Sequence, residues 1–159
     1  MTTVTLRELT EKDRLVLFGF QQDPEANHMA AFTSEDPTDE AAHHKWWDMI
    51  MGNGGITKRG ILSDGALVGS VLTFTMDGQL EVTYWIAKPH WGKGIATEAL
   101  RQLLQIVDQR PIYARAATDN KGSLRVLDKC GFVVCAEEQG FANARGAEIA
   151  EYVLRKDDA

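Results

Sequence analysis

Apolar and polar residues alternate along much of this chain, and at a few places the alternation gives way to helical spacing. Period-two runs bounded by turn residues predict strands over residues 4–9, 56–62, 67–75, 80–87, 112–117, 132–136 and 147–154. Apolar residues three or four positions apart predict helices that begin at Thr10, Thr38, Ile95 and Asn120. The irregular stretch from Asp23 to Pro37 is expected to be a loop.

The order of these elements predicts the topology. The strands between residues 56 and 87 are joined by turns that contain Asp64-Gly65 and Asp77-Gly78, which is typical of antiparallel hairpins. A β-α-β succession follows this meander and indicates a parallel pair. We therefore expect an α/β fold of the mixed α+β kind, with a mostly antiparallel sheet of about seven strands and about four helices on its faces. A chain of 159 residues without repeat or linker predicts one domain spanning 1–159.

Composition narrows the function classes. Hydrophobic residues make up 44% of the chain and charged residues 25%, as in an ordinary globular protein. The formal net charge of −6 disfavours nucleic acid as a partner and would suit a cationic or amine substrate. No run approaches the roughly 18 apolar residues of a membrane span, and no secretory signal pattern is visible at the N-terminus. We expect a cytoplasmic protein without a membrane partner.

Few residues could bind a metal. Cys130 and Cys135 lie in or beside an apolar stretch and are expected to be buried, reduced thiols. A disulfide is disfavoured, because five positions along a strand place two side chains on opposite faces. His43 and His44 are adjacent on a predicted helix and point apart, so we interpret them as solvated or packing residues. No metal site is expected.

The strongest local signal is the loop Trp91-Gly92-Lys93-Gly94-Ile95-Ala96-Thr97, between a predicted strand and a predicted amphipathic helix. Gly92 and Gly94 let the backbone approach another group closely. The N–H groups at a helix start point outward, with the positive end of the helix dipole behind them, and bind phosphate oxygens. Lys93 adds a cation at the rim, and Thr97 adds a hydroxyl donor. The alternative is that the two glycines only form a turn.

Three phosphate-binding chemistries compete for this loop. A nucleoside-triphosphate loop ends in Gly-Lys-Ser/Thr, whereas Gly94 follows Lys93 here. A dinucleotide fingerprint needs a third glycine where Thr97 stands, and it needs a parallel sheet. Coenzyme A, with a pyrophosphate and a long peptide-like arm, remains.

Three motifs in register resemble the GNAT acetyltransferase superfamily, and within it the branch of ribosomal-protein N-terminal acetyltransferases. The family's pyrophosphate loop, Gln/Arg-x-x-Gly-x-Gly/Ala, corresponds to residues 91–96, where Trp91 replaces Gln/Arg. Its Asn-x-x-Ser and Lys-x-Gly-Phe motifs correspond to residues 120–123 and 129–132. The strand motif Glu-x-x-Tyr-Trp-Ile corresponds to residues 81–86. The resemblance covers essentially the whole chain.

This resemblance implies an enzyme that transfers an acetyl group from acetyl-CoA to a primary amine by direct attack in a ternary complex. It implies that the pantetheine arm of acetyl-CoA lies along the end of the third meander strand, where one backbone N–H polarises the thioester carbonyl. The residues expected to bind the cofactor are Trp85, Ile86, Ala87, Trp91, Gly92, Lys93, Gly94, Ile95, Ala96, Thr97, Asn120, Ser123 and Lys129.

Acyl transfer to an amine needs a neutral nucleophile and a stabilised leaving group. Glu81 is the candidate general base, directly or through water, because partial burial in an apolar strand raises the pKa of a carboxyl. The alternative is a surface carboxylate at a strand edge. Ser123 is the candidate hydrogen-bond donor to the departing thiolate, unless it only caps a helix. Tyr113 is a weaker candidate proton donor, and Asn120 contacts the cofactor arm or caps the helix.

The acceptor amine is expected to lie beside Glu81, Phe32, Trp46 and Trp47 if the family arrangement holds. Adjacent tryptophans on one helix cannot both face a core squarely, so one is expected to line or cover the cleft. The alternative is that one packs and the other is exposed without a role.

Two other functions stay open at this point. One is a sensor module that binds acyl-CoA without turnover. The other is a dinucleotide oxidoreductase, which Thr97 and the antiparallel meander disfavour. The acceptor is a protein N-terminus or a small-molecule amine, and the sequence does not choose between them. An exposed edge strand or the tryptophan-rich helix offers a surface for a homodimer.

Overall fold

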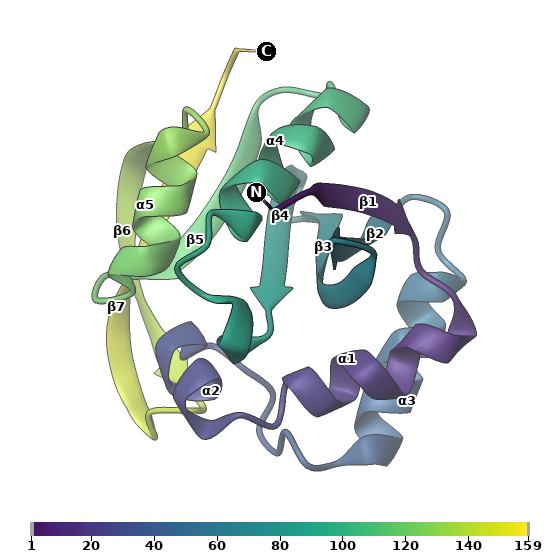
Figure 1. The fold of residues 1–159 in the computed structure, drawn as a ribbon. Helices are drawn as coiled ribbons and strands as arrows, with labels where there is room; N and C mark the ends of the chain where they lie inside the picture. The colour runs from purple at the N-terminus through teal and green to yellow at the C-terminus, as the bar shows by residue number, and fades with distance from the viewer. Residues whose placement is uncertain (1, 159) are drawn as a thin grey trace.

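A computed structural model describes residues 2–158 as a central sheet with helices packed against it (Figure 1). The strands are β1 (Val4–Glu8), β2 (Thr57–Ser63), β3 (Ala66–Met76), β4 (Gln79–Ile86), β5 (Ile112–Ala117), β6 (Val133–Ala142) and β7 (Ala147–Lys156). The helices are α1 (Arg14–Phe20), α2 (Pro24–Ala30), α3 (Glu40–Met51), α4 (Ile95–Ile106) and α5 (Lys121–Lys129). The predicted mixed α/β fold is confirmed.

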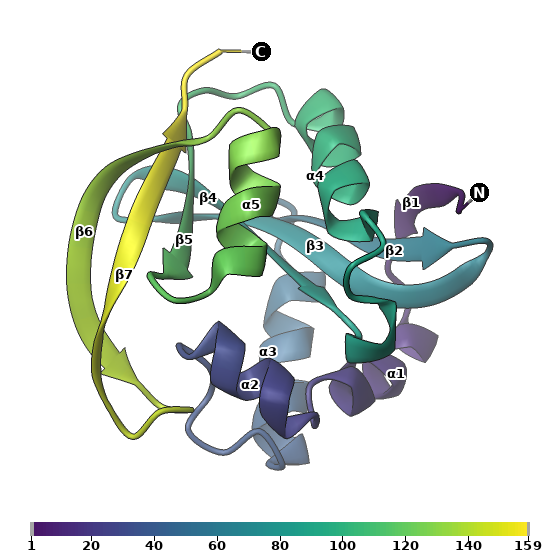
Figure 2. The same cartoon turned by 60° about the vertical axis from the view of Figure 1, so that its left-hand side comes forward.

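The sheet has seven strands in the order β1-β2-β3-β4-β5-β7-β6. All neighbouring strands are antiparallel except β4 and β5, which are parallel. The pairing of β4 with β5 is short, because only Leu80 and Glu81 have register partners, in Ile112 and Tyr113. Beyond Glu81 the two strands separate, and the later residues of β4 face no strand on that side (Figure 2).

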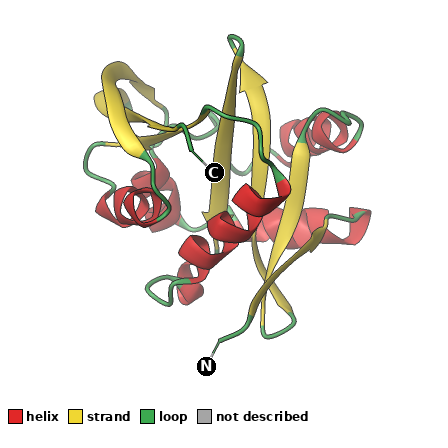
Figure 3. Cartoon of the chain, turned by 90° about the horizontal axis from the view of Figure 1, so that it is seen from above, coloured by secondary structure: helices red, strands yellow, loops and turns green. Residues whose placement is uncertain are grey.

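Helices pack against the sheet (Figure 3), and two of its three apolar clusters hold α1, α3, α4 and α5 there. The larger cluster joins α4 and α5 to one face, with Leu100, Leu103 and Leu127 fully buried. The smaller joins α1 and α3 to the other face through residues such as Leu17 and Trp47. The opening between β4 and β5 is therefore flanked by α5 on one face and by the α1–α3 layer on the other.

The prediction of a loop from Asp23 to Pro37 is wrong for its first half, which forms α2. The Asp23 carboxylate accepts a hydrogen bond from the Ala26 N–H at 2.7 Å, and Pro24 occupies the first helical position. This combination of an N-cap and a proline is a helix-start signal, and it outweighs the irregular composition of the stretch.

The last two strands and one cysteine also differ from expectation. Strand β6 continues to Ala142 because it pairs along its length with β7 in one long hairpin. Strand β6 is the edge of the sheet and is exposed over most of its length, so Cys135 is exposed, contrary to prediction. Cys130 is buried as predicted, and both thiols are free.

Candidate active site

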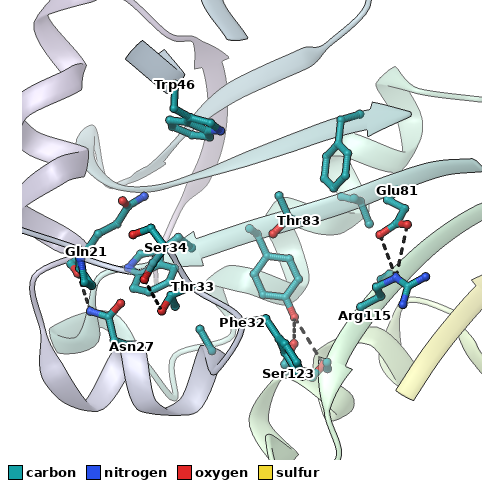
Figure 4. Close-up of a pocket in the computed structure, with 18 of the residues that line it drawn as sticks. Gln21, Asn27, Phe32, Thr33, Ser34, Trp46, Glu81, Thr83, Arg115 and Ser123 are labelled. Carbon is teal, nitrogen blue, oxygen red and sulfur yellow. Dashed lines mark hydrogen bonds and ion pairs between the residues drawn. The ribbon is translucent and has the colours of Figure 1, made fainter. Parts of the chain in front are cut away.

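Two cavities meet at the opening between β4 and β5. The first has a volume of about 850 Å³, and we call it the Glu81 cavity because Glu81 lines it (Figure 4). The second has a volume of about 600 Å³ and is called the loop cavity, because residues of the 91–97 loop line it. Residues that line both cavities are Ala30, Tyr84, Trp85, Asn120 and Ser123. Two reactants bound in the two cavities would therefore meet at these side chains.

The loop cavity lies against the start of α4. Gly92 and Gly94 have φ angles of 76° and 75°, in the left-handed region that favours glycine. Gly94 is the N-cap of α4 and offers no side-chain oxygen, so capping is left to another group. Within residues 2–158, the N–H groups of Ile95, Ala96 and Thr97 donate no hydrogen bond. This arrangement can accept the oxygens of a phosphate group.

Most of the predicted cofactor residues surround this cavity. They are Trp85, Ile86, Trp91, Gly92, Gly94, Ile95, Ala96, Thr97, Asn120, Ser123 and Lys129. Lys93 and Ala87 are not among the lining residues. Arg125 lines the cavity and was missed from the sequence, although it lies one helical turn before Lys129 on α5. Two cations of α5 thus face the cavity that the free N–H groups also face.

The end of β4 presents fewer backbone groups than the sequence suggested. The Ala87 N–H donates to the Val68 carbonyl at 2.8 Å, so it is already engaged with the meander. In an antiparallel ladder the hydrogen-bonding direction alternates, so the backbone of Trp85 also faces β3 and that of Ile86 faces the opening. The Ala87 N–H is therefore not free for the arm, and among these three residues we expect the backbone of Ile86 to bind it.

The Trp91 side chain explains how the loop tolerates the loss of Gln/Arg at this position. Its Nε1–H donates to the Ile86 carbonyl at 2.8 Å, which fixes the indole against the end of β4. The Ile86 N–H, on the same side of the strand, keeps its direction toward the opening. Trp91 therefore ties the phosphate-binding loop to the strand that faces the cofactor arm.

A pair of hydroxyl groups lies where the two cavities meet. The Tyr84 oxygen is 2.7 Å from Ser123 Oγ. Burial raises the pKa of Tyr84 to about 12, although the hydrogen bond to Ser123 acts in the opposite direction. Asn120 caps α5, since its side-chain oxygen accepts from the Ser123 N–H at 3.2 Å. Tyr113, the weaker candidate proton donor from the sequence, lies under the Arg155 guanidinium and lines neither cavity.

Tyr84 was not selected from the sequence, but a signal for it was present. It alternates with Val82 and Ile86, which face the α4–α5 side of the sheet, so its side chain points toward Ser123. Glu81 and Thr83 point to the opposite face. The single strand β4 thus supplies groups to both sides of the opening.

Glu81 is buried, with 4% of its surface exposed, and it does not lie at a solvated strand edge. Its Oε1 is 3.4 Å from Arg115 Nε (Figure 4). Arg115 Nη1 also contacts Glu138 at 3.2 Å and Glu151 at 3.0 Å. Burial raises the pKa of Glu81, Arg115 opposes this rise, and the other two carboxylates add to it. A buried carboxylate with a raised pKa is a suitable proton acceptor.

The two neighbouring tryptophans have different environments. Trp46 and Phe32 line the Glu81 cavity. Trp47 is fully buried between α1 and the sheet, and its Nε1–H donates to Glu11 at 3.2 Å. It lines neither cavity, so its predicted contact with the acceptor is corrected. Adjacent helical positions are about 100° apart, which sends one indole into the core and the other into the cavity.

No helix within residues 2–158 is long and apolar enough to cross a membrane. In the same part of the chain, no group of three or more His, Cys, Asp or Glu side chains is placed to hold a metal ion.

A sheet that opens between two parallel strands, beside a helix start with free N–H groups, defines a class of acyl-coenzyme-A-binding transferases. Consistent with this class, the family model described as an acetyltransferase (GNAT) domain matches residues 3–133. The chain therefore belongs to the GNAT acetyltransferase family. The family and the enzyme class are confirmed as predicted.

Individual relatives support this assignment. Bacillus subtilis YdaF, which carries the name of a ribosomal N-acetyltransferase, is 31% identical over 61% of this chain, and the match spans 58% of that protein. The Bacillus licheniformis N-acetyltransferase p20 is 25% identical over 95% of this chain and 90% of its own. The crystal structure of the microcin C7 self-immunity acetyltransferase MccE with acetyl-CoA and AMP has a TM-score of 0.80 at 19% identity. The structural match covers 97% of this chain and 92% of the MccE chain, and it shows that the two proteins share a fold.

Proposed function

We propose that this protein transfers the acetyl group of acetyl-CoA to a primary amine by direct attack in a ternary complex. The observation that carries the proposal is the meeting of two cavities at Tyr84 and Ser123. One cavity offers free N–H groups and cations, and the other contains the buried carboxylate of Glu81. Each cavity suits one of the two reactants, so attack needs no covalent intermediate on the protein.

The loop cavity has the groups that the cofactor requires. The N–H groups of residues 95–97 bind the pyrophosphate, with Lys93 at the rim and Arg125 and Lys129 facing the remaining phosphate charge. The Ile86 N–H at the opening binds the pantetheine arm, as an added strand would. When bound, acetyl-CoA supplies an acetyl group activated as a thioester.

The hydroxyl pair is placed to serve the leaving group. With a pKa of about 12, Tyr84 keeps its proton at neutral pH and donates to Ser123 or to the sulfur. Ser123 Oγ, at 2.7 Å from the Tyr84 oxygen, passes a proton toward the sulfur while it receives one from the phenol. The two hydroxyls therefore act as one donor unit rather than as two independent acids.

Glu81 provides the base on the opposite side of the opening. Its carboxylate accepts a proton from the acceptor ammonium, directly or through a water molecule, and leaves the neutral amine that attack requires. Arg115 opposes the rise in the pKa of Glu81 that burial causes. Phe32 and Trp46 supply apolar walls for the body of the acceptor.

Several finer expectations remain proposals. The acceptor is a protein N-terminus, as the name of YdaF suggests, or a small-molecule amine. Residues 1–159 form one catalytic domain in the cytoplasm, which the two free cysteines support. A homodimer through the exposed edge strand β6 remains a prediction that light scattering tests.

Thiol release from acetyl-CoA, measured with a panel of primary amines and peptide N-termini, tests the proposed function. We expect turnover with at least one amine, a large loss in Glu81→Gln, and normal rates in Glu148→Gln, which changes an exposed glutamate of β7 outside both cavities. Calorimetry with acetyl-CoA is measured in parallel. Stoichiometric binding without turnover on any amine would identify a sensor and refute the enzyme.

A further inference from the structure

We infer that the preferred acceptor is an amine that carries a second positive charge. This inference rests on the proposed function, because it takes the Glu81 cavity as the acceptor site. Five carboxylate side chains line that cavity, namely Asp36, Asp39, Asp77, Glu81 and Glu151. Arg115 is the one Lys or Arg side chain among its lining residues. The cavity is therefore strongly negative, in contrast to the loop cavity with Arg125 and Lys129.

The single cation of the Glu81 cavity does not neutralise it. Arg115 is bound by Glu81, by Glu151 and by a third carboxylate, Glu138. One guanidinium group thus has three carboxylate partners, and the three aspartates that line the cavity add further negative charge. A cationic substrate is drawn into such a cavity, and an anionic one is repelled from it.

One histidine of the cavity is suited to bind an ammonium group. His43 lines the cavity and is only 9% exposed, and within residues 2–158 its Nε2 has no hydrogen-bond partner. Burial lowers the pKa of His43, so the ring is neutral, adds no positive charge and can accept a hydrogen bond. The charges of Arg14 and Glu40, which form an ion pair at 3.3 Å, act on the pKa of this ring in opposite directions.

Aromatic rings and a carboxylate complete this end of the cavity. The rings of Phe18 and Trp46 lie 4.8 and 5.7 Å from the His43 ring, between centroids. Faces of aromatic rings attract cations, and Asp39 lines the same cavity one helical turn before His43. Trp46 lies across the cavity from the Glu81–Arg115 pair (Figure 4). An acceptor spanning the cavity places its reactive amine near Glu81 and its second ammonium near His43.

Three acceptors that each have four carbon atoms isolate the effect of the second charge. They are 1,4-diaminobutane, butylamine and 4-aminobutyrate, which end in an ammonium, a methyl group and a carboxylate. We expect kcat/KM to fall roughly tenfold from the diamine to butylamine, and further to 4-aminobutyrate. The preference for the diamine should weaken as salt is raised, because screening reduces the field of the rim carboxylates.

A charge-removing variant locates the effect. Asp39→Asn keeps the N-cap of α3, since asparagine caps as well as aspartate, and it removes one charge from the cavity. We expect it to reduce the ratio of kcat/KM for the diamine to that for butylamine by about threefold to tenfold. Glu35→Gln is the control, because Glu35 is exposed in the same loop and does not line the cavity, and its ratio should stay unchanged.

Equilibrium binding separates this inference from the proposed function. Calorimetry of the three amines with the protein saturated in coenzyme A measures selectivity without turnover. Tighter binding of the diamine supports the inference even if thiol release is absent, which would count against the proposed function alone. Equal affinity for the diamine and butylamine, or an equal loss of preference in Glu35→Gln and Asp39→Asn, overturns the inference.

Discussion

Replacing Gly69 by alanine puts a methyl group where β3 meets the end of β4. A Cβ atom at this position would overlap the Trp85 carbonyl oxygen, and it would lie 3.1 Å from the Trp85 carbonyl carbon and 3.2 Å from Ile86 Cα. All three obstacles are backbone atoms, so no side-chain rotation relieves the contact. The end of β4 must move away from β3, and Ile86 moves with it.

The size of the effect follows from this geometry. Overpacking in a well-packed interior costs about 1–3 kcal/mol, and we expect the upper end of that range because the obstacles are backbone atoms. Displacement of the Ile86 N–H by about an ångström also misplaces the cofactor arm, which is expected to lower kcat/KM roughly a hundredfold. Stability and activity should therefore both fall in Gly69→Ala.

Urea denaturation and steady-state kinetics measure the two effects. The matched control is Gly19→Ala, because Gly19 lies in exposed helix α1 and has no atom within 4 Å of an added Cβ. Alanine is a better helix former than glycine, so this control should raise the free energy of unfolding by roughly 0.5–1 kcal/mol and leave kcat/KM unchanged.

A Gly69→Ala variant that is as stable as the parent protein and binds acetyl-CoA with the same affinity would contradict this prediction. Such a result would mean that β3 and β4 do not pack as closely as the structure shows. A loss of stability with normal cofactor affinity would keep the packing argument and remove the link between Gly69 and the arm-binding N–H of Ile86.

Substitutions at four further residues test the remaining parts of the structure. Arg115→Gln removes the group that opposes the rise in the pKa of Glu81, so this pKa should rise further. The acidic limb of the kcat/KM–pH profile should then move to higher pH, and Arg115→Lys should largely restore the original profile. Tyr84→Phe and Ser123→Ala should each lower kcat by about tenfold to a hundredfold. The double variant should lower kcat little more than either single variant, because the two hydroxyls share one hydrogen bond. Additive losses would refute a single donor unit. Trp47→Ala should lower the free energy of unfolding by about 3–5 kcal/mol in urea without changing the acceptor KM of the folded protein.

The sequence by itself determined the features that depend on near neighbours in the chain. Helical and strand periods, the two Asp-Gly turns and the 91–97 loop are local patterns, and they predicted most of the element order and the phosphate-binding helix start. The resemblance in three motifs added the family, which was confirmed, and the cofactor, which stays a proposal. The local signal of Asp23-Pro24 for α2 was also present in the sequence, but it was overlooked.

Only the tertiary structure decided which groups face one another across the opening. Tyr84 and Ser123 are 39 residues apart, and Glu81 and Arg115 are 34 apart, so their contacts depend on strand register and helix packing. In the folded structure Trp47 lies in the core, and the Ala87 N–H donates a hydrogen bond within the sheet. Periodicity fixes the face on which a side chain lies, but the partner on that face is set by long-range packing, which no local pattern encodes.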